Sequence, residues 1–300
     1  LICGPYGWGE FAPFLEYGAQ ESAAWLACTL EAAWLPTPKP VRTRIPLNAT
    51  LPAVPAERVP EVLAKYEGEI QELKIKVAEK GQSLADDIAR VAAAREALPN
   101  ARLKVDANMG YTLAGALEAL RKLCEYGIIY AEQPVASIED MAALRFAIAK
   151  EGLPARIAAD ESIRKAEDPL KVARANAADL MVIKAAPLGG VRRALALVEQ
   201  AQLPAVVSSA LESSVGIGVG ASLAASLPTL RYGCGLGTVS LMAEDVTDEP
   251  LIARDGFMDL RAITPSPQRL ERLATDEQTR QWWVERVTAC YRVLERACGL

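Results

Sequence analysis

The 300-residue sequence predicts an α/β fold, in which a closed barrel of parallel strands carries a smaller α+β unit over one end. Three observations predict it. Short apolar segments alternate with longer helical patterns from about residue 41 onward, polar residues recur at strand ends every 24 to 30 residues, and both ends of the chain lack this pattern. Strand–helix alternation produces parallel strands joined by helical crossovers. Eight strand positions within about 220 residues favour a closed barrel over an open sheet.

The expected strands are short and mostly apolar. They cover 41–47, 72–77, 101–106, 128–132, 157–160, 180–183 and 205–209, with a weaker eighth strand over 232–236. No G-x-G-x-x-G motif follows the first strand, which argues against a dinucleotide-binding fold.

The expected helices have clear starts and stops. They cover 83–98, 112–126, 137–150 and 191–202. Ser83, Thr112 and Ser137 stand at cap positions, and Pro99 and Gly127 follow the ends of the first two helices.

The two ends of the chain differ from the middle. Residues 20–35 read as one helix before the stiff segment "PTPKP", and a charged helical tail follows "TPSPQ". We expect residues 1–40 and 266–300 to form an α+β capping domain and residues 41–265 to form the catalytic barrel. The sequence does not begin with Met, and we expect the first part of the capping domain to be truncated.

Composition excludes several classes of protein. The net charge is −5 and no basic run is present, which argues against a nucleic-acid partner. Apolar stretches are interrupted before they reach membrane-spanning length, and the start resembles no signal peptide. The six cysteines form no C-x-x-C motif, which is typical of reduced thiols in a cytoplasmic protein. The sequence does not indicate an oligomeric state.

The absence of histidine narrows the possible chemistry. With no histidine in the chain, Ser-His-Asp sites, Cys-His sites and His-ligated zinc are all excluded. Catalysis must therefore use carboxylates, lysines, tyrosines or a metal ion held by oxygen atoms.

Acidic residues end three consecutive expected strands. Asp106, Glu132 and Asp160 occupy the strand–loop junctions at which barrel enzymes place their catalytic groups. Three carboxylates at one rim repel each other, and a hard divalent cation relieves that repulsion. The pattern therefore predicts a Mg²⁺ site, with Mn²⁺ as an alternative ion, which would bind a small-molecule carboxylate substrate.

Lysines flank these carboxylates. Lys74 and Lys76 share one face of their strand, and Lys184 lies four strands further on, across the barrel mouth. A lysine whose pKa is lowered by nearby positive charge can remove a proton next to a metal-bound carboxylate. Asn108 is either a turn residue or an outer hydrogen-bond partner. Glu161 is expected either to support the ligands from behind or to be an ion-pair partner.

Each of these motifs has a simpler explanation when taken alone. A strand-end aspartate is often a helix cap, Glu132-Gln133-Pro134 can be a surface turn, and Lys74-Ile75-Lys76 can be a solvated edge. Their coincidence at matching strand ends favours the metal site.

Five ordered motifs then carry a resemblance to a known family. They are Lys74-Ile75-Lys76, Asp106-Ala107-Asn108, Glu132-Gln133-Pro134, Asp160-Glu161-Ser162, and Lys184 followed by Gly189-Gly190. With these motifs the chain resembles the muconate-lactonizing subgroup of the enolase superfamily. The resemblance implies a (β/α)7β modified TIM barrel with a capping domain. It also implies Mg²⁺ on Asp106, Glu132 and Asp160, with catalytic Lys76 and Lys184 on opposite faces of the substrate.

Three further stretches, "GWGEFAPF", "SSALESSVGI" and "GLGTVSLM", are most similar to the dehydrating lyases of that subgroup. That similarity implies loss of water from a succinylated hydroxycyclohexadiene carboxylate. Lys76 would move the proton, and Lys184 would stabilise the anionic intermediate. The implied substrate contacts are Lys74, Asn108, Ser208, Ser209, Ser213 and Gly235. Taken singly, each serine is equally consistent with a helix entry.

Several other functions remain open. An N-acylamino acid racemase also needs lysines on both faces, whereas a dipeptide epimerase needs an Asp-x-Asp that residues 234–238 lack. A class I aldolase would use one lysine as a Schiff base and would not need three carboxylates. A barrel that binds metal without catalysis is the non-enzymatic alternative.

Overall fold

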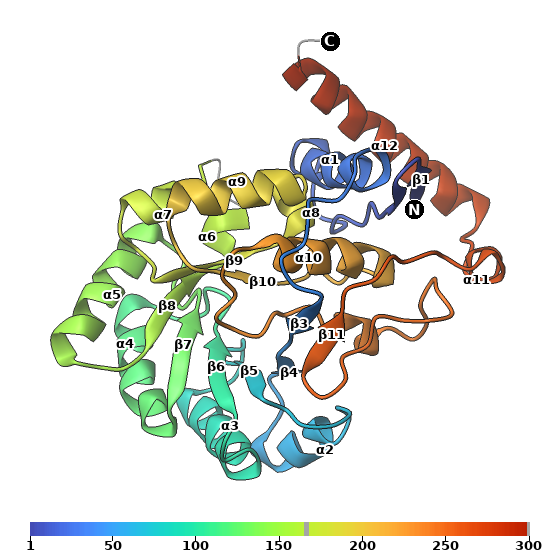
Figure 1. Cartoon of the computed structure of the whole chain (residues 1–300). Coiled ribbons are helices and arrows are strands. Elements are labelled where there is room, and N and C mark those ends of the chain that lie inside the picture. Colours follow the sequence, from blue (N-terminus) through green and yellow to red (C-terminus); the bar gives the residue numbers. More distant parts are fainter. Residues whose placement is uncertain (165–167, 299–300) are drawn as a thin grey trace.

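The computed structural model describes residues 1–164 and 168–298, and its centre is a curled parallel sheet (Figure 1). Its strands are β4 (Ala49–Leu51), β5 (Glu72–Lys76), β6 (Arg102–Asp106), β7 (Ile128–Glu132), β8 (Arg156–Ala159), β9 (Leu180–Ile183) and β10 (Ala205–Val207). Each strand pairs in parallel with the next one along the chain. This order confirms the predicted strand–helix alternation.

A short segment after β10 closes the barrel. Cys234 forms a parallel bridge with Leu47, and Gly235 forms one with Ser208. The predicted eighth strand over 232–236 is therefore reduced to these bridges. Seven full strands and this short eighth segment form the modified TIM barrel that the sequence predicts.

The position predicted for the first strand, 41–47, is wrong. Within it, β3 (Arg44–Pro46) pairs antiparallel with β11 (Phe257–Asp259) beside the barrel, and the barrel begins at β4. Strand β3 has one exposed face, because Ile45 is buried whereas Arg44 is exposed and stacks on Phe257.

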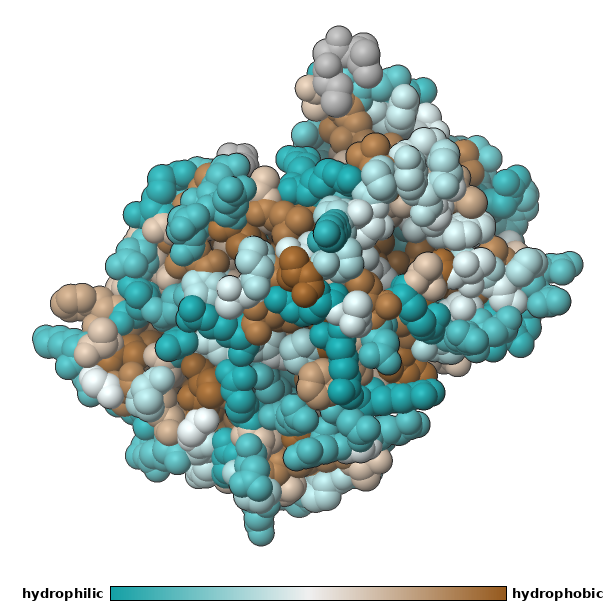
Figure 2. Space-filling view, in the orientation of Figure 1, coloured by the Kyte–Doolittle hydropathy of each residue, from teal (hydrophilic) through white to brown (hydrophobic). Residues whose placement is uncertain are grey.

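Helices cover the outside of the barrel (Figure 1). They are η1 (Ala56–Arg58), α2 (Val59–Leu63), α3 (Leu84–Ala97), α4 (Leu113–Leu123), η2 (Cys124–Tyr126), α5 (Ile138–Glu151), α6 (Glu161–Arg164), α7 (Lys171–Arg174), α8 (Ala185–Leu188), α9 (Val191–Ala201), α10 (Ser214–Ser226) and η3 (Thr238–Leu241). Ser83, Thr112 and Ser137 cap α3, α4 and α5 through their side chains, as predicted. On the face in Figure 2, polar residues cover most of this layer and apolar residues show between them in small patches.

The two ends of the chain lie together at one side of the barrel. They form β1 (Ile2–Gly4), β2 (Gly7–Gly9), α1 (Ala19–Trp34), α11 (Pro267–Arg272) and α12 (Glu277–Cys298). Helix α1 packs between α8 of the barrel and α12, where Leu26 and Cys290 are buried together. The domain boundaries at residues 40 and 266 stay a prediction. Among the described residues, no helix is both long and apolar enough to cross a membrane.

The bottom of the barrel interior is charged. Glu72, at the start of β5, accepts hydrogen bonds from Arg102 (2.6 Å), from Lys104 (3.1 Å) and from the backbone N–H of Gly233 (2.8 Å). We call Glu72, Arg102, Lys104 and Gly233 the lower network. It joins β5 and β6 to the segment that closes the barrel. A small apolar cluster of Tyr130, Ala158, Leu180, Val182, Val206 and Tyr232 lies against it, with Lys104 over the ring of Tyr130 and Arg102 over that of Tyr232.

Candidate active site

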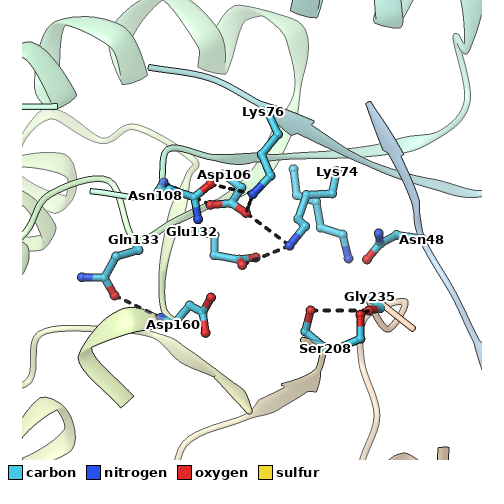
Figure 3. Close-up of polar contacts among 12 residues, drawn as sticks. Asn48, Lys74, Lys76, Asp106, Asn108, Glu132, Gln133, Asp160, Ser208 and Gly235 are labelled. Carbon is cyan, nitrogen blue, oxygen red and sulfur yellow. Dashed lines mark hydrogen bonds and ion pairs between the residues drawn. The ribbon is translucent and has the colours of Figure 1, made fainter. Parts of the chain in front are cut away.

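The C-terminal ends of neighbouring strands bring the predicted residues together (Figure 3). Lys76, Asp106 and Glu132 are the last residues of β5, β6 and β7, and they stand opposite one another in the strand register. Asp160 follows β8 directly and Lys184 follows β9. We call these five residues and Lys74 the rim network.

The two lysines of β5 share Asp106, and Lys74 also binds Glu132. The Nζ atom of Lys76 lies 2.6 Å from Oδ2 of Asp106 and 2.6 Å from Oδ1 of Asn108. The Nζ atom of Lys74 lies 3.1 Å from Oε1 of Glu132 and 3.3 Å from Oδ2 of Asp106. The Lys76 side chain is 31% exposed and that of Lys74 only 11%. Lys76 is therefore the lysine of β5 that incoming molecules can reach more easily.

Asp160 carries the opposite side of the network. Its Oδ2 accepts a hydrogen bond from Nζ of Lys184 at 2.7 Å. Its Oδ1 is buried and, among the described residues, has no hydrogen-bond partner, although Nε of Arg164 lies 3.4 Å away. The Arg164 guanidinium donates instead to Glu161 (2.9 Å) and to the hydroxyl of Tyr17 in the capping part (3.0 Å). The predicted ion-pair role of Glu161 is thus confirmed.

The rim carboxylates differ in how readily they ionise. Burial raises the pKa of Glu132 to about 7, and the neighbouring Asp106 and Asp160 add to this increase. Burial acts in the same direction on Asp106, but Lys74 and Lys76 outweigh it and hold the pKa of that carboxyl at about 2. Burial lowers the pKa of Lys74, but Glu132 and Asp106 outweigh it and raise that pKa overall. The rim therefore favours additional positive charge beside Glu132.

The donor chemistry of the rim fits a hard divalent cation. Asp106, Glu132 and Asp160 offer only carboxylate oxygens, which Mg²⁺ prefers, and Oδ1 of Asp160 lacks a hydrogen bond in the described part of the chain. In the structure, each of the three carboxylates forms an ion pair with a lysine. Within residues 1–164 and 168–298, no three acidic or cysteine side chains form a ready ligand set. Ion binding would therefore require these side chains to exchange lysine contacts for metal contacts.

Two buried amides at the site were not identified as functional from the sequence. Oε1 of Gln133 accepts hydrogen bonds from the backbone N–H groups of Asp160 and Ser162, both at 3.1 Å, and so holds the start of the loop after β8. The sequence shows Gln133 only as a polar residue between Glu132 and Pro134, and its burial is visible only in the structure. Asn48, which lies beside the site in Figure 3, immediately precedes β4 and was hidden by the misplaced first strand.

The serine-rich loop after β10 lies across the site from Lys74 and Lys76 (Figure 3). The hydroxyls of Ser208 and Ser209 lie 3.5 Å and 2.9 Å from the carbonyl oxygen of Gly235. Ser213 differs, because its hydroxyl caps α10 and donates to the Glu10 carboxylate at 2.5 Å. The predicted substrate contacts of Lys74, Asn108, Ser208, Ser209, Ser213 and Gly235 stay predictions.

Comparisons with known proteins agree with this geometry. Residues 56–265 match the family model described as "Enolase C-terminal domain-like", and residues 1–33 match "Enolase N-terminal domain-like". The chain is 55% identical over 295 residues to an o-succinylbenzoate synthase of Mycolicibacterium smegmatis, covering 98% of this chain and 89% of that protein. It is 50% identical to the Mycobacterium leprae protein of the same name, covering all of this chain and 87% of that protein.

Solved structures place the fold in the same group. Muconate cycloisomerase from Pseudomonas fluorescens superposes with a TM-score of 0.67 at 27% identity, covering 78% of this chain and 66% of that one. 2-Chloromuconate cycloisomerase from Rhodococcus opacus gives a TM-score of 0.69 at 27% identity, covering 79% and 67%. The chain belongs to the o-succinylbenzoate synthase family, within the enolase superfamily.

Proposed function

We propose that the chain is a lyase that dehydrates a succinylated hydroxycyclohexadiene carboxylate to o-succinylbenzoate, a step of menaquinone biosynthesis. One observation carries this proposal: in a chain 55% identical to an o-succinylbenzoate synthase, Lys76 and Lys184 flank three strand-end carboxylates at the barrel mouth. This arrangement can hold an anionic substrate between two lysine side chains.

Lys76 is the proposed acid–base group. Its Nζ removes the proton from the ring carbon next to the carboxylate. The same ammonium group then returns a proton to the departing hydroxyl, so that water leaves and the ring becomes aromatic. Asn108 and Asp106, each 2.6 Å from Nζ, fix the direction of this amine.

Lys184 is the proposed electrostatic group. From the far side of the mouth, its ammonium stabilises the negative charge that develops when the proton leaves. Lys74 neutralises Glu132 and Asp106, which lie nearest to it. Ser208, Ser209 and Gly235 would contact the succinyl arm, and Ser213 would hold their loop in place.

We propose Mg²⁺ as the divalent cation of this chain, with Mn²⁺ as an alternative, held by Asp106, Glu132 and Asp160. When bound, the ion supplies positive charge beside the substrate carboxylate. The proposed partner is a small carboxylate substrate. We also propose a cytoplasmic location, because the five cysteines among the described residues are free thiols.

The decisive experiment follows the ultraviolet spectrum of purified protein mixed with the cyclohexadiene substrate. Formation of the aromatic product in Mg²⁺, and its loss with a chelator, is the expected result. No aromatic product with Mg²⁺ or Mn²⁺ would refute the proposal. Borohydride trapping with substrate tests the aldolase alternative, because only a Schiff base leaves a covalent adduct.

A racemase activity is the second candidate function. The observation that favours it is the placement of Lys76 and Lys184 on opposite sides of the rim, which racemisation through a planar anion requires. Loss of optical rotation from an N-acylamino acid would demonstrate it. An unchanged rotation would exclude it.

A further inference from the structure

An ion pair is buried in the wall of the barrel, beneath the loops that carry the rim network. Nη1 of Arg90 lies 2.9 Å from Oδ1 of Asp87, both on α3. Arg90 is fully buried and Asp87 is 1% exposed. Buried ion pairs add little net stability, and their best-supported role is to specify one geometry.

The pair binds three successive loops at the C-terminal end of the barrel. Arg90 donates to the carbonyl of Val54 after β4 (2.6 Å) and to the carbonyl of Lys76 at the end of β5 (2.9 Å). Arg90 also donates to the side chain of Gln82. Asp87 accepts from the N–H of Ala78 (2.9 Å) and from the hydroxyl of Tyr111, which follows β6 (2.6 Å).

The loops after β5 and β6 also touch directly. Ala78 has a φ of 57°, a left-handed conformation that is unfavourable for alanine and is held by the Asp87 hydrogen bond. A Cβ atom added to Gly110 would lie 2.5 Å from the carbonyl oxygen of Ala78, so only glycine fits. The backbone immediately after Lys76 therefore has one narrowly defined path.

We propose that Asp87, Arg90 and Tyr111 form a positioning group for Lys76. They fix the backbone end of this residue, while Asn108 and Asp106 fix its ammonium. The inference rests on the proposed role of Lys76 as the base. Proton transfer is sensitive to such placement, because a displacement of about 1 Å can cost about 100-fold in rate.

The test replaces Tyr111 with Phe, which removes the hydroxyl that binds Asp87 and keeps the aromatic ring. Tyr126→Phe is the matched control, since Tyr126 lies just beyond the other end of α4, away from the mouth. For Tyr111→Phe we expect kcat to fall about 10-fold, a smaller loss than a full 1 Å displacement gives. KM should stay within about 2-fold. Substrate deuterated at the carbon next to the carboxylate should show an increased isotope effect, because proton transfer becomes more rate-limiting. Melting temperature should fall somewhat, because the buried Asp87 loses a hydrogen bond, while Mg²⁺ affinity should match that of the control.

An unchanged kcat, or an effect on KM alone, would overturn the proposal. If Tyr111→Phe does not fold, Gln82→Leu removes a different hydrogen bond from Arg90 and is judged by the same criteria. Lys76→Ala separates the two ideas. If it retains normal activity, the proposed base is wrong; if it is inactive while Tyr111→Phe is fully active, only the positioning role is wrong.

Discussion

The rim network and the lower network occupy the same barrel, yet they differ in how completely the hydrogen-bonding capacity of their carboxylates is used. In the lower network, one carboxylate meets two cations and a backbone N–H, and Lys104 also donates to the carbonyl of Gly233 at 2.7 Å. In the rim network, three carboxylates share three lysines, and Oδ1 of Asp160 has no hydrogen bond among the described residues. The pKa of Glu132 is also raised to about 7.

The contrast shows how position along a strand changes the role of a charged residue. Glu72 and Lys76 lie four residues apart on β5, at opposite ends of the barrel interior. Glu72 ties the first strands to the closing segment, where fully satisfied hydrogen bonds stabilise the fold. Lys76 faces the open mouth, where Oδ1 of Asp160, unpartnered among the described residues, and the raised pKa of Glu132 favour the binding of a cation. Mutations should therefore separate activity from stability.

The largest expected effect is on the rim. Replacing Lys76 with Ala should lower kcat by about 10²–10⁴-fold, which is typical of a lost acid–base group. The melting temperature should change little, because Lys74 still neutralises Asp106. Steady-state kinetics and thermal unfolding check both statements. A variant with near-normal kcat would remove Lys76 from this role.

The lower network should respond in the opposite way. Glu72→Ala leaves Lys104 buried without its carboxylate, and should lower the free energy of unfolding by about 3–5 kcal/mol. Urea unfolding measures this loss, and activity per folded molecule should persist. Glu72→Gln, which keeps an acceptor for Gly233, should lose less. If these variants lost activity per folded molecule while the free energy of unfolding stayed unchanged, the proposed difference between the two networks would be wrong.

Metal addition should affect the rim alone. Mg²⁺ at about 100 times its dissociation constant should stabilise the protein by about 2.7 kcal/mol. Asp160→Asn should reduce this gain, while Glu72→Gln should keep it. Thermal unfolding with and without a chelator provides the measurement. An equal gain in Asp160→Asn would contradict the ligand assignment.

The smallest expected effect concerns Glu212, a buried carboxylate in the loop after β10. Burial raises its pKa from 4.5 to about 7, and Glu10 contributes. The folded state therefore binds the proton more tightly than the unfolded state, so stability should fall as the pH rises from about 4.5 to about 7. Melting curves should show a shallower decline in Glu212→Gln than in the wild type. Parallel curves would mean that another group titrates.

The sequence predicted the rim better than the parts that hold it. Asp106, Glu132 and Lys184 were identifiable because parallel strands place their ends at one edge, so spacing along the chain translates directly into proximity. The first barrel strand was misplaced because β4 has only three residues and another three-residue strand, β3, lies just before it in the sequence. The burial of Arg90 was not predicted, because a charged residue on a surface helix normally faces solvent.

Contacts between segments that are far apart in the chain were the hardest to predict from the sequence. Ser213 was predicted to lie near the substrate, but its hydroxyl meets Glu10, which is 203 residues away in the chain. Neither residue type nor spacing encodes such a pairing. Only the packing of the capping part on the barrel creates it.

That pairing has a consequence for engineering. The Glu10 carboxylate accepts hydrogen bonds from the N–H groups of Ser213 and Gly216 as well as from the Ser213 hydroxyl, so the first turn of α10 is completed by a residue of the other structural unit. In a chimera that combines this barrel with a foreign capping part, the N–H groups at the start of α10 would lose their acceptor unless the new capping part supplies an equivalent carboxylate. Transplanting the two units together should preserve the shape of the serine-rich loop.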